Sequence, residues 1–411
     1  MFCLYNISVY TTGFFLKIVA LFNKKIRLFT EGRKETFGIL NLKIKKEDRI
    51  LWFHCASLGE FEQGRPLIEA VKEKYPAYKI LLTFFSPSGY EVQKNYAFAD
   101  VVTYLPLDTK KNVKRFLDIV HPEMVFFIKY EFWPNILREL LNRNTETLLI
   151  SGVFRKDQAF FKFYGGWMRR SLKAFSHFFV QNKESEELLQ SIGLLNVTIS
   201  GDTRFDRVSE ILKQDNSLGF IENFKQNKYT LVAGSTWPSD EKYLINYINN
   251  QADKDEKIII APHNIKPELI ADLKKKIKKK ITMFSDKVKN NEAQVFIVDT
   301  VGILTKVFSY ADAAYIGGGF DKEGVHNVLE PATFGLPVII GPVYSNFKEA
   351  VDLVELGGCK VVKDQASFNK SLKTLYADPD YRKEKGNISK AYILKNVGAT
   401  KIILDYVAEK I

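Results

Sequence analysis

Two series of short apolar runs, each followed by an amphipathic stretch, constrain the fold of this chain most strongly. The first series lies at 49–56, 79–85, 101–107, 124–128, 147–151 and 177–181, and the second at 229–234, 257–263, 295–300, 313–319 and 337–342. Continuous apolar runs of this length indicate strands that are buried on both faces, and helical stretches between them favour parallel pairing. The sequence therefore predicts an α/β protein with two doubly wound, Rossmann-like domains.

A polar segment at 213–228 separates the two series and predicts a linker. We therefore expect a first domain at 35–212, a second domain at 229–390, and a C-terminal helix at 391–411 that could cross back to the first domain. The length of 411 residues allows two or three domains. Two similar Rossmann-like domains facing a cleft resemble the GT-B architecture of glycosyltransferases, a likeness that concerns the fold alone.

Residues 1–34 stand apart from this alternation. Residues 1–22 are mostly apolar, and as a helix they would be roughly 33 Å long, about the thickness of a bilayer core. From Lys17 to Lys34 there are six basic residues against Glu31 alone, which is the flank expected on the cytoplasmic side of a membrane. This pattern predicts a membrane-associated helix at an anionic membrane surface. The alternative is a buried N-terminal helix.

The net charge of +12 implies an anionic partner. A lysine-rich segment at 272–281 is typical of a solvated helix end, with a second membrane contact or a nucleic-acid contact as the alternative. Cys3, Cys55 and Cys359 form no C-x-x-C pair, and the one D-x-D triplet, at 253–255, lies in a charged loop. We therefore predict no disulfide framework, no metal site and no cofactor.

The segment 54–68 contains the candidate catalytic residue. A strand ends there, a loop of small residues turns, and Glu60 precedes a helix. A carboxylate near a helix N-terminus is held ionised and can take a proton from a hydroxyl nucleophile. The alternative is that Glu60 only caps its helix. We expect His54, inside the strand, to be packed rather than catalytic.

The run at 317–342 is the most specific candidate for ligand binding. Its glycines would let the backbone approach a ligand closely, and Asn327 and Glu330 follow at a predicted helix start. Other strands of the second series end in small or polar residues, at 233–236, 261–263 and 299–302. Several such ends on one sheet edge would form a pocket for a nucleotide.

Together these segments resemble the Kdo transferases, which move 3-deoxy-D-manno-octulosonic acid (Kdo) from CMP-Kdo to the lipid A precursor. The matching stretches are WFHCASLGE (52–60), YEFWPN (130–135), SGDTRFDR (200–207), AGSTWPSDE (233–241), IIAPHNIKPE (259–268), VDTVG (298–302) and much of 317–347. The apolar N-terminus followed by basic residues matches as well. The resemblance covers almost the whole chain.

The resemblance implies a role for each matching residue. Glu60 would be the catalytic base, and the acceptor side would include Ser57, Gly59, Glu131 and Arg155. The CMP of the donor would lie on the second domain, bound by Ser235, Thr236, Pro262, His263, Gly302, Ile303, Leu304, Asn327, Val328, Leu329 and Glu330.

Three positions depart from the family pattern. His263 stands where Arg is frequent, so Lys266 would have to supply the cation near the donor phosphate. Ile303 stands where Glu is frequent, which leaves only main-chain contacts at that turn. The family usually has N-A-R in the segment that corresponds to 151–155 of this chain, and only Arg155 matches that pattern.

The function implied is an inverting, metal-independent glycosyltransferase that transfers Kdo from CMP-Kdo to the tetraacyl disaccharide bisphosphate precursor of lipid A. It would work at the cytoplasmic face of the inner membrane of a Gram-negative cell, with no nucleic-acid partner. One alternative is another GT-B enzyme that uses a UDP-sugar on a lipid or peptidoglycan acceptor. A remote alternative is a membrane-tethered basic protein that binds nucleic acid, whose affinity would fall steeply with salt.

Overall fold

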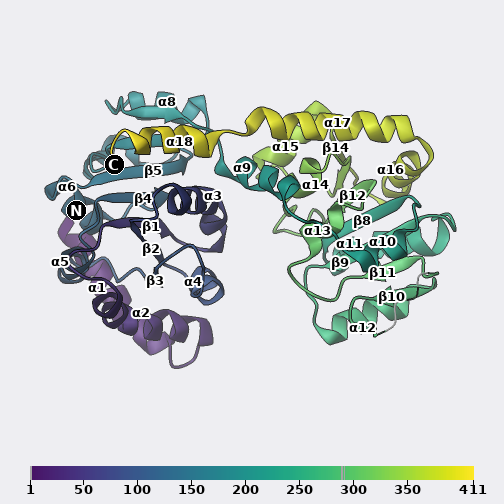
Figure 1. The fold of residues 1–411 in the computed structure, drawn as a ribbon, viewed down its shortest axis with the longest axis horizontal. Coiled ribbons are helices and arrows are strands. Elements are labelled where there is room, and N and C mark those ends of the chain that lie inside the picture. Colours follow the sequence, from purple (N-terminus) through teal and green to yellow (C-terminus); the bar gives the residue numbers. More distant parts are fainter. Residues whose placement is uncertain (1, 288–289, 291) are drawn as a thin grey trace. The chain divides into compact units, whose positions relative to one another are not determined.

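The computed structural model describes residues 2–287, 290 and 292–411. The chain forms two compact units (Figure 1): the first runs to Arg207 and includes Val397–Ile411, and the second is Val208–Asn396. Each unit contains one seven-stranded sheet. The division of the chain therefore falls just before the polar segment at 213–228.

The first unit is a parallel sheet in the order β3-β2-β1-β4-β5-β6-β7, the arrangement of a doubly wound fold. Its strands are β1 (Ile50–Cys55), β2 (Lys79–Phe84), β3 (Val101–Tyr104), β4 (Met124–Ile128), β5 (Glu146–Gly152), β6 (His177–Val180) and β7 (Val197–Ile199). Its helices are α1 (Phe2–Val19), α2 (Lys24–Lys43), α3 (Leu58–Lys74), α4 (Pro87–Gln93), α5 (Lys110–Val120), α6 (Pro134–Asn142), α7 (Gly166–Leu172), α8 (Lys183–Gln190), the first part of α9 (Thr203–Glu210) and α18 (Ala399–Ala408), with 3-10 turns at Ala159–Phe161 and Phe163–Gly165.

The second unit repeats this plan with the order β10-β11-β9-β8-β12-β13-β14, again all parallel. Its strands are β8 (Thr230–Thr236), β9 (Lys257–Pro262), β10 (Ile281–Met283), β11 (Val295–Ile297), β12 (Ala313–Ile316), β13 (Val338–Ile340) and β14 (Cys359–Val361). Its helices are α10 (Gly219–Lys225), α11 (Pro238–Asn250), α12 (Pro267–Lys276), α13 (Leu304–Phe308), α14 (Leu329–Thr333), α15 (Lys348–Leu356), α16 (Gln365–Ala377) and α17 (Pro379–Asn396), with a 3-10 turn at Ile211–Lys213.

The prediction of two doubly wound α/β domains is confirmed. Each apolar run that we assigned as a strand contains one, and in the central strands β1 and β4 every residue is buried. The sequence analysis missed β7, β10 and β14, which are three-residue strands at sheet edges. An edge strand has a neighbour on one side only, so it needs neither the length nor the continuous apolar character of a central strand.

The segment at 213–228 is more ordered than a polar linker. It contains α10, whose Ile221 and Phe224 are buried in the second unit. The ring of Phe224 lies 5.4 Å from that of Phe296 on β11, and the main-chain N–H of Leu218 donates to the Tyr310 hydroxyl. Lys225 of the same helix pairs with Asp312, so apolar and polar contacts together dock this short helix.

Helix α1 is the one described helix that is long and apolar enough to cross a membrane, by length and composition. Its mean hydropathy reaches 1.3, none of it is buried, and side chains such as Leu4, Ile7 and Phe14 are more than half exposed. Its contacts with the rest of the first unit include two polar ones: the Tyr5 hydroxyl donates to Asp108, and Asn135 donates to Asn6. The alternative of a buried N-terminal helix is wrong for this segment.

Helix α2 packs on β3 with its own buried face. Phe29, Thr36 and Leu40 are buried, and the Thr36 hydroxyl donates to the main-chain oxygen of Tyr104. Gly32 lies directly against the Tyr104 ring, where an added Cβ would come within 2.2 Å of a ring carbon.

The C-terminal helix α18 packs against the first unit, with Ile403 and Val407 buried in the same cluster as strands β1 and β2. The carboxylate of Asp206 accepts main-chain hydrogen bonds from Gly398 and Thr400, each 2.6 Å long. One buried carboxylate therefore fixes the start of α18.

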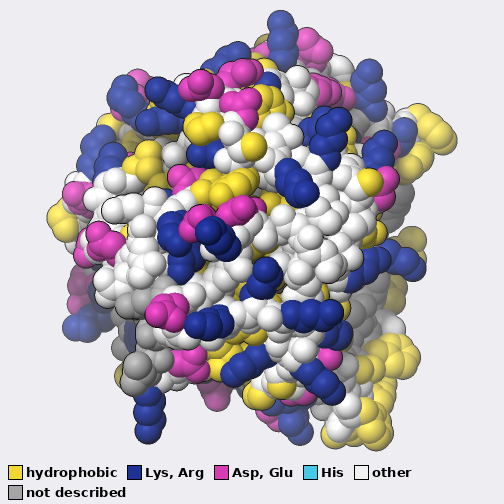
Figure 2. All heavy atoms as spheres, turned by 90° about the vertical axis from the view of Figure 1, so that its right-hand side faces the viewer, with side chains coloured by type: hydrophobic (Ala, Val, Ile, Leu, Met, Phe, Trp, Pro, Cys, Tyr) yellow, Lys and Arg dark blue, Asp and Glu magenta, His cyan; other side chains and the backbone are white. Residues whose placement is uncertain are grey.

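The lysine-rich segment lies where α12 ends, and Lys274, Lys275, Lys276, Lys278 and Lys280 are exposed. Lys276 pairs with Asp272, and Lys280 with Glu292. Figure 2 shows basic side chains of the second unit scattered among acidic ones on the face that it draws. These contacts are those of a solvated helix end.

The glycines after β12 make close main-chain contacts within the protein. An added Cβ at Gly317 would lie 2.4 Å from the main-chain oxygen of Ser235, and one at Gly319 would lie 2.6 Å from the nitrogen of Gly341. We expected these glycines to let the backbone approach a ligand, but what they approach in the structure is the backbone after β8 and β13.

Gly317→Ala should therefore lower the thermal unfolding midpoint of the second unit, because overpacking a close main-chain contact costs about 1–3 kcal/mol. Differential scanning calorimetry measures the midpoint. Gly38→Ala, in helix α2 with nothing within 4 Å of the added Cβ, is the control and should be neutral or slightly stabilising. An unchanged midpoint in Gly317→Ala would contradict the packing role.

Candidate functional site

Glu60 lies in the first turn of α3, directly after the loop that follows β1. The N-cap residue Ser57 makes no side-chain hydrogen bond to the helix backbone, and its hydroxyl instead donates to the Glu60 carboxylate. The side chain of Glu60 is half-buried. Its carboxylate therefore contacts a neutral hydroxyl at the carboxyl edge of the sheet.

A second carboxylate, Glu131, lies after the neighbouring strand β4 and is held by two nitrogen donors. The indole Nε1 of Trp133 donates to its Oε2 over 2.8 Å, and Nε2 of His54 lies 3.1 Å from the same oxygen. The ring of His54 is completely buried, as expected for a packed residue. Glu131 is thus anchored to the interior of the sheet.

The other ring nitrogen of His54, Nδ1, contacts Thr83. The Trp52 indole N–H donates to the Thr83 hydroxyl over 2.8 Å, and the Thr83 oxygen lies 2.8 Å from Nδ1 of His54. The main-chain oxygen of Thr83 lies 3.2 Å from the same Nδ1, so Thr83 can partner either protonation state of this nitrogen. The contact of Nε2 with the Glu131 carboxylate is a hydrogen bond when Nε2 carries the proton.

Cys55, at the end of β1, is buried beneath these carboxylates. Burial raises the pKa of its thiol well above the usual value, and the charges of Glu60, Glu131 and Glu62 raise it further. A neutral, buried thiol is a poor nucleophile. The acidic groups at this edge, and not the cysteine, are therefore the candidates for proton chemistry.

The remaining acceptor-side candidates lie at the same edge of the sheet. Gly59 is exposed in the first turn of α3, and Arg155, three residues after β5, is exposed with its guanidinium 5.8 Å from the Tyr130 ring. Lys129 after β4 and Ser151 in β5 have φ angles of 65° and 54°. Non-glycine residues in the left-handed region concentrate at functional sites, where the surrounding structure maintains the strain.

The matching segment at 200–207 fixes the helix that carries Glu60. Asp202 accepts from the Gln63 side chain at 3.1 Å and pairs with Arg204 at 2.8 Å, while Arg207 pairs with Glu62 at 2.6 Å. These contacts hold α3 one turn beyond Glu60. The sequence analysis quoted this segment as part of the family resemblance but gave it no role. In the structure, its contacts hold α3 in position.

In the second unit, three rings stack beside the ends of β8 and β9. The ring of His263 lies 4.6 Å from those of Trp237 and His326, with interplanar angles of 15° and 18°. The Trp237 indole N–H donates to Nε2 of His326 over 2.7 Å. Burial, helped by the neighbouring His263, lowers the pKa of His326, so the neutral ring that accepts this hydrogen bond is favoured.

The predicted donor residues at 302–304 and 327–330 come together in the structure. Glu330 in α14 accepts from the Thr305 hydroxyl at 2.7 Å and from the Asn327 amide at 3.0 Å, and Thr305 follows the 302–304 turn directly. Gly302 has a φ of 90°, which glycine adopts without strain. Val328 and Leu329 are buried and support this turn.

The other donor candidates lie at the ends of β8 and β9. Ser235 has a φ of 54° and is half-buried, whereas the Thr236 hydroxyl is buried and donates to Glu241. Pro262 ends β9, and the N–H of His263 donates to the main-chain oxygen of Thr236. Of Ser235 and Thr236, Ser235 is the one whose side chain reaches solvent.

The sequence profile of the 3-deoxy-D-manno-octulosonic-acid (Kdo) transferases matches residues 31–207. The Kdo transferase of Haemophilus influenzae is 28% identical over 412 residues, which covers 95% of this chain and 94% of that protein. That of Aquifex aeolicus is 27% identical and covers 75% of this chain and 80% of its own length. Over almost its whole length the chain is therefore similar to the Kdo transferases.

Two solved structures share the fold of this chain. UDP-GlcNAc 2-epimerase from Neisseria meningitidis matches with a TM-score of 0.60 and 15% identity, over 88% of this chain and all of that chain. MurG from Acinetobacter baumannii matches with a TM-score of 0.55 and 10% identity, over 88% of this chain and 99% of that one. At this level of identity the likeness concerns the GT-B fold alone.

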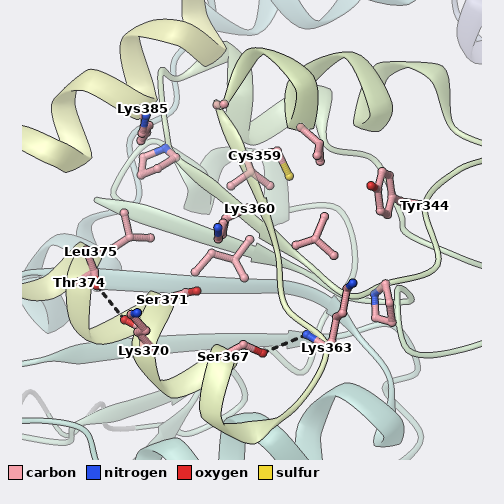
Figure 3. Close-up of a pocket in the computed structure, with 18 of the residues that line it drawn as sticks. Tyr344, Cys359, Lys360, Lys363, Ser367, Lys370, Ser371, Thr374, Leu375 and Lys385 are labelled. Carbon is pink, nitrogen blue, oxygen red and sulfur yellow. Dashed lines mark hydrogen bonds between the residues drawn. The ribbon is translucent and has the colours of Figure 1, made fainter.

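A cavity of about 1150 Å³ in the second unit lies away from the candidate donor residues. It borders the edge strand β14, and Lys360, Lys363, Lys370 and Lys385 line it together with hydroxyl side chains (Figure 3). The candidate donor residues lie after the carboxyl ends of β8, β9, β11 and β12, and none of them lines this cavity. In the part of the chain that the structure describes, no three His, Cys, Asp or Glu side chains are grouped to hold a metal ion.

Sequence reasoning missed the stacking of Trp237 and His326 on His263 and the bond from His54 to Glu131. The histidines were too far apart in the sequence to suggest a site. The position of His54 and His263 at or just beyond the carboxyl end of a parallel strand was the one available signal.

The pKa shift of His326 predicts a pH dependence of stability. Its folded-state pKa lies below the ordinary value of 6.5, so the unfolded chain takes up this proton first as the pH falls. The contribution of His326 to stability is therefore complete above about pH 6.5 and decreases below it. Scanning calorimetry from about pH 7.5 to about pH 5.5 should show a smaller decline of the second unit's midpoint in His326→Gln than in the wild type.

His121→Asn is the matched control, because it removes a histidine from the first unit at a left-handed position that Asn tolerates. It should leave the pH dependence of the second unit unchanged. Parallel declines in the wild type and His326→Gln would contradict the assignment.

Proposed function

We propose that this protein is a Kdo transferase and that it moves Kdo from CMP-Kdo to the tetraacyl disaccharide bisphosphate precursor of lipid A, with inversion and without a metal ion. The observation that carries the proposal is the half-buried Glu60 carboxylate at the carboxyl end of β1, in a chain that is similar to the Kdo transferases over 95% of its length. The acceptor hydroxyl loses its proton to Glu60 and attacks the anomeric carbon of Kdo while CMP leaves. Attack on the face opposite the leaving group inverts that carbon.

Glu60 suits the role of general base because the carboxylate at the end of the neighbouring strand, Glu131, is already engaged. Glu131 is bound by His54 and Trp133, whereas Glu60 is bound by the hydroxyl of Ser57. A hydroxyl can rotate and accept from, or donate to, an incoming sugar hydroxyl. The approach of the acceptor therefore needs no ion pair to break.

We place the CMP on the second unit, at Glu330 and the 302–304 turn. A carboxylate is a good acceptor for ribose hydroxyls, and Glu330 already accepts from a hydroxyl, that of Thr305. Lys266, exposed at the N-cap of α12, and His263 at the end of β9 would balance the charge of the leaving phosphate.

The acceptor is a lipid, and α1 provides the means to reach it. Its exposed apolar side chains would lie in the inner membrane, with the basic residues of α1 and α2 at the anionic cytoplasmic surface. Polar bonds from Tyr5 and Asn6 would keep this helix joined to the first unit.

Glu60→Gln tests the proposed base, because it keeps the size of the side chain and removes its basicity. Turnover should fall by roughly 10²–10⁴-fold, the usual contribution of a positioned base. The assay measures the product mass after purified protein is incubated with CMP-Kdo, formed in situ, and the lipid A precursor. CMP affinity should stay unchanged, because the proposed CMP residues lie in the other unit.

Glu62→Gln is the control on the same helix. It removes the ion pair with Arg207 and should change stability by about 1 kcal/mol or less, with near-normal turnover. Turnover of Glu60→Gln within about threefold of the wild type would exclude Glu60 as the base. No Kdo transfer by the wild type, with transfer from a UDP-sugar, would overturn the proposed donor.

Glu330→Ala tests the donor site. It removes a charged acceptor for the ribose, and CMP affinity should fall by roughly 10–100-fold, as expected for one or two charge-assisted hydrogen bonds. Isothermal titration with CMP measures the affinity. Glu323→Ala, an exposed carboxylate in the preceding loop, should bind CMP as the wild type does. Equal affinities in all three proteins would move the nucleotide to another part of the unit.

A further inference from the structure

A half-buried cation in the first unit, Arg33, has no compensating anion among the described residues. The guanidinium of Arg33 in α2 donates to two main-chain oxygens, those of Phe29 and Phe85, at 2.9 and 2.6 Å. Its Nε is buried and has no hydrogen-bond partner. Arg33 forms no ion pair with any described carboxylate, and burial lowers its pKa to about 9. A buried charge without a counter-charge is costly unless a ligand supplies one.

Three aromatic rings hold the Arg33 side chain in place. The central guanidinium carbon lies 3.5 Å from the centre of the Phe29 ring, 4.7 Å from that of Phe85 and 5.0 Å from that of Tyr104. Cation–π contacts and two hydrogen bonds fix the plane of the guanidinium and leave several N–H groups for an anion. The group is therefore preorganised for a phosphate or a carboxylate.

Arg33 lines a cavity of about 630 Å³ between α1, α2 and the loop after β3. This volume lies within the range of small-molecule sites. Leu16, Ala20, Phe29, Phe37 and Leu107 supply an apolar wall. Lys17, Arg27 and Lys34 add three further cations, against the single acid Glu31, and none of them forms an ion pair within the described chain. The cavity thus combines an apolar part with a cationic part.

The ligand chemistry that fits both parts is an amphiphile with an anionic head. Leu21 at this cavity is 75% exposed, and the neighbouring Phe22 is 86% exposed, so the cavity opens beside the most apolar surface of the unit. A lipid would enter from that side and could contact the apolar wall, whereas a free anion has no apolar group to do so.

We propose that the cavity between α1 and α2 binds one phosphate-bearing lipid, with the phosphate on Arg33 and an acyl chain along the apolar wall. The proposal rests on the placement of α1 at a membrane. Two sources supply this chemistry, a phospholipid of the bilayer and the phosphorylated lipid acceptor itself. The N–H of Ser86, next to Phe85, donates to the main-chain oxygen of Ala56 in the Glu60 loop, so either lipid would lie near the catalytic edge.

The first experiment measures binding of dihexanoyl phosphatidic acid, below its critical micelle concentration, to the full-length protein in a neutral detergent. We expect saturable binding that is at least tenfold tighter than that of inorganic phosphate, which has no chain, or of dihexanoyl phosphatidylcholine, which has no net charge. Arg33→Met, which keeps an apolar side chain among the rings, should weaken binding at least tenfold. Lys114→Met removes an exposed charge of α5 outside the cavity and should bind as the wild type does.

Two further measurements separate this role from a structural one. Without lipid, Arg33→Met should unfold at the same temperature as the wild type or higher, because it removes an uncompensated buried charge. Ala20→Phe fills the apolar wall and leaves Arg33 in place, and it should weaken binding of the lipid while inorganic phosphate binds as before. Equal affinity of the wild type and Arg33→Met for phosphatidic acid would overturn the proposal, as would equal affinity of the wild type for the lipid and inorganic phosphate.

Turnover distinguishes the two sources. If the acceptor occupies the cavity, phosphatidic acid should compete with it, and Arg33→Met should raise the acceptor KM at least tenfold. If a bilayer phospholipid occupies it, the short-chain lipid should bind without competing. Binding is measured independently of Kdo transfer, so loss of the proposed enzymatic function would leave this test intact.

Discussion

Parallel strand pairing is the constraint on which the candidate sites of this protein depend. Because every strand of a parallel sheet runs in one direction, all the carboxyl ends lie on a single edge, and the loops that follow them gather there. Glu60 after β1 and Glu131 after β4 are neighbours for this reason, since β1 pairs directly with β4. The stack of Trp237 and His263 arises in the same way from the pairing of β8 with β9.

Buried aspartates fasten the elements that surround these edges. Asp108 accepts main-chain bonds at the start of α6 and the hydroxyl of Tyr5 in α1. Asp240 accepts from Trp237, Gly318 and the Tyr315 hydroxyl, and joins α11 to the glycine turn after β12. Burial raises the pKa of both carboxyl groups, while the donated hydrogen bonds oppose that rise. Each aspartate therefore links segments far apart in sequence at one point.

The sequence predicted the central strands and the two-domain plan because interior strands must be apolar throughout. It predicted less where the physical requirement is weaker, as in the three-residue edge strands and in α10, where Ile221 and Phe224 are the buried side chains. It also predicted which segments carry the candidate site residues, but not their contacts. The strained φ angles of Lys129, Ser151 and Ser235 cannot be predicted from the residue types at these positions. The bond of His54 to Glu131 could not be predicted either, because it joins residues 77 positions apart.

The three glutamates near the end of β1 show how contacts assign different roles to one residue type. Glu62 forms an ion pair with Arg207, which helps to hold α3 in position. Glu131 accepts from an indole and an imidazole that are themselves fixed by the sheet, so its position is rigid. Glu60 contacts a hydroxyl on a loop of small residues, and a hydroxyl can change its partner at little cost. A general base must take up a proton and release it in each cycle, so a carboxylate with a strong cationic partner is a poor choice. Among these three groups, the contacts therefore leave Glu60 as the one suited to proton transfer.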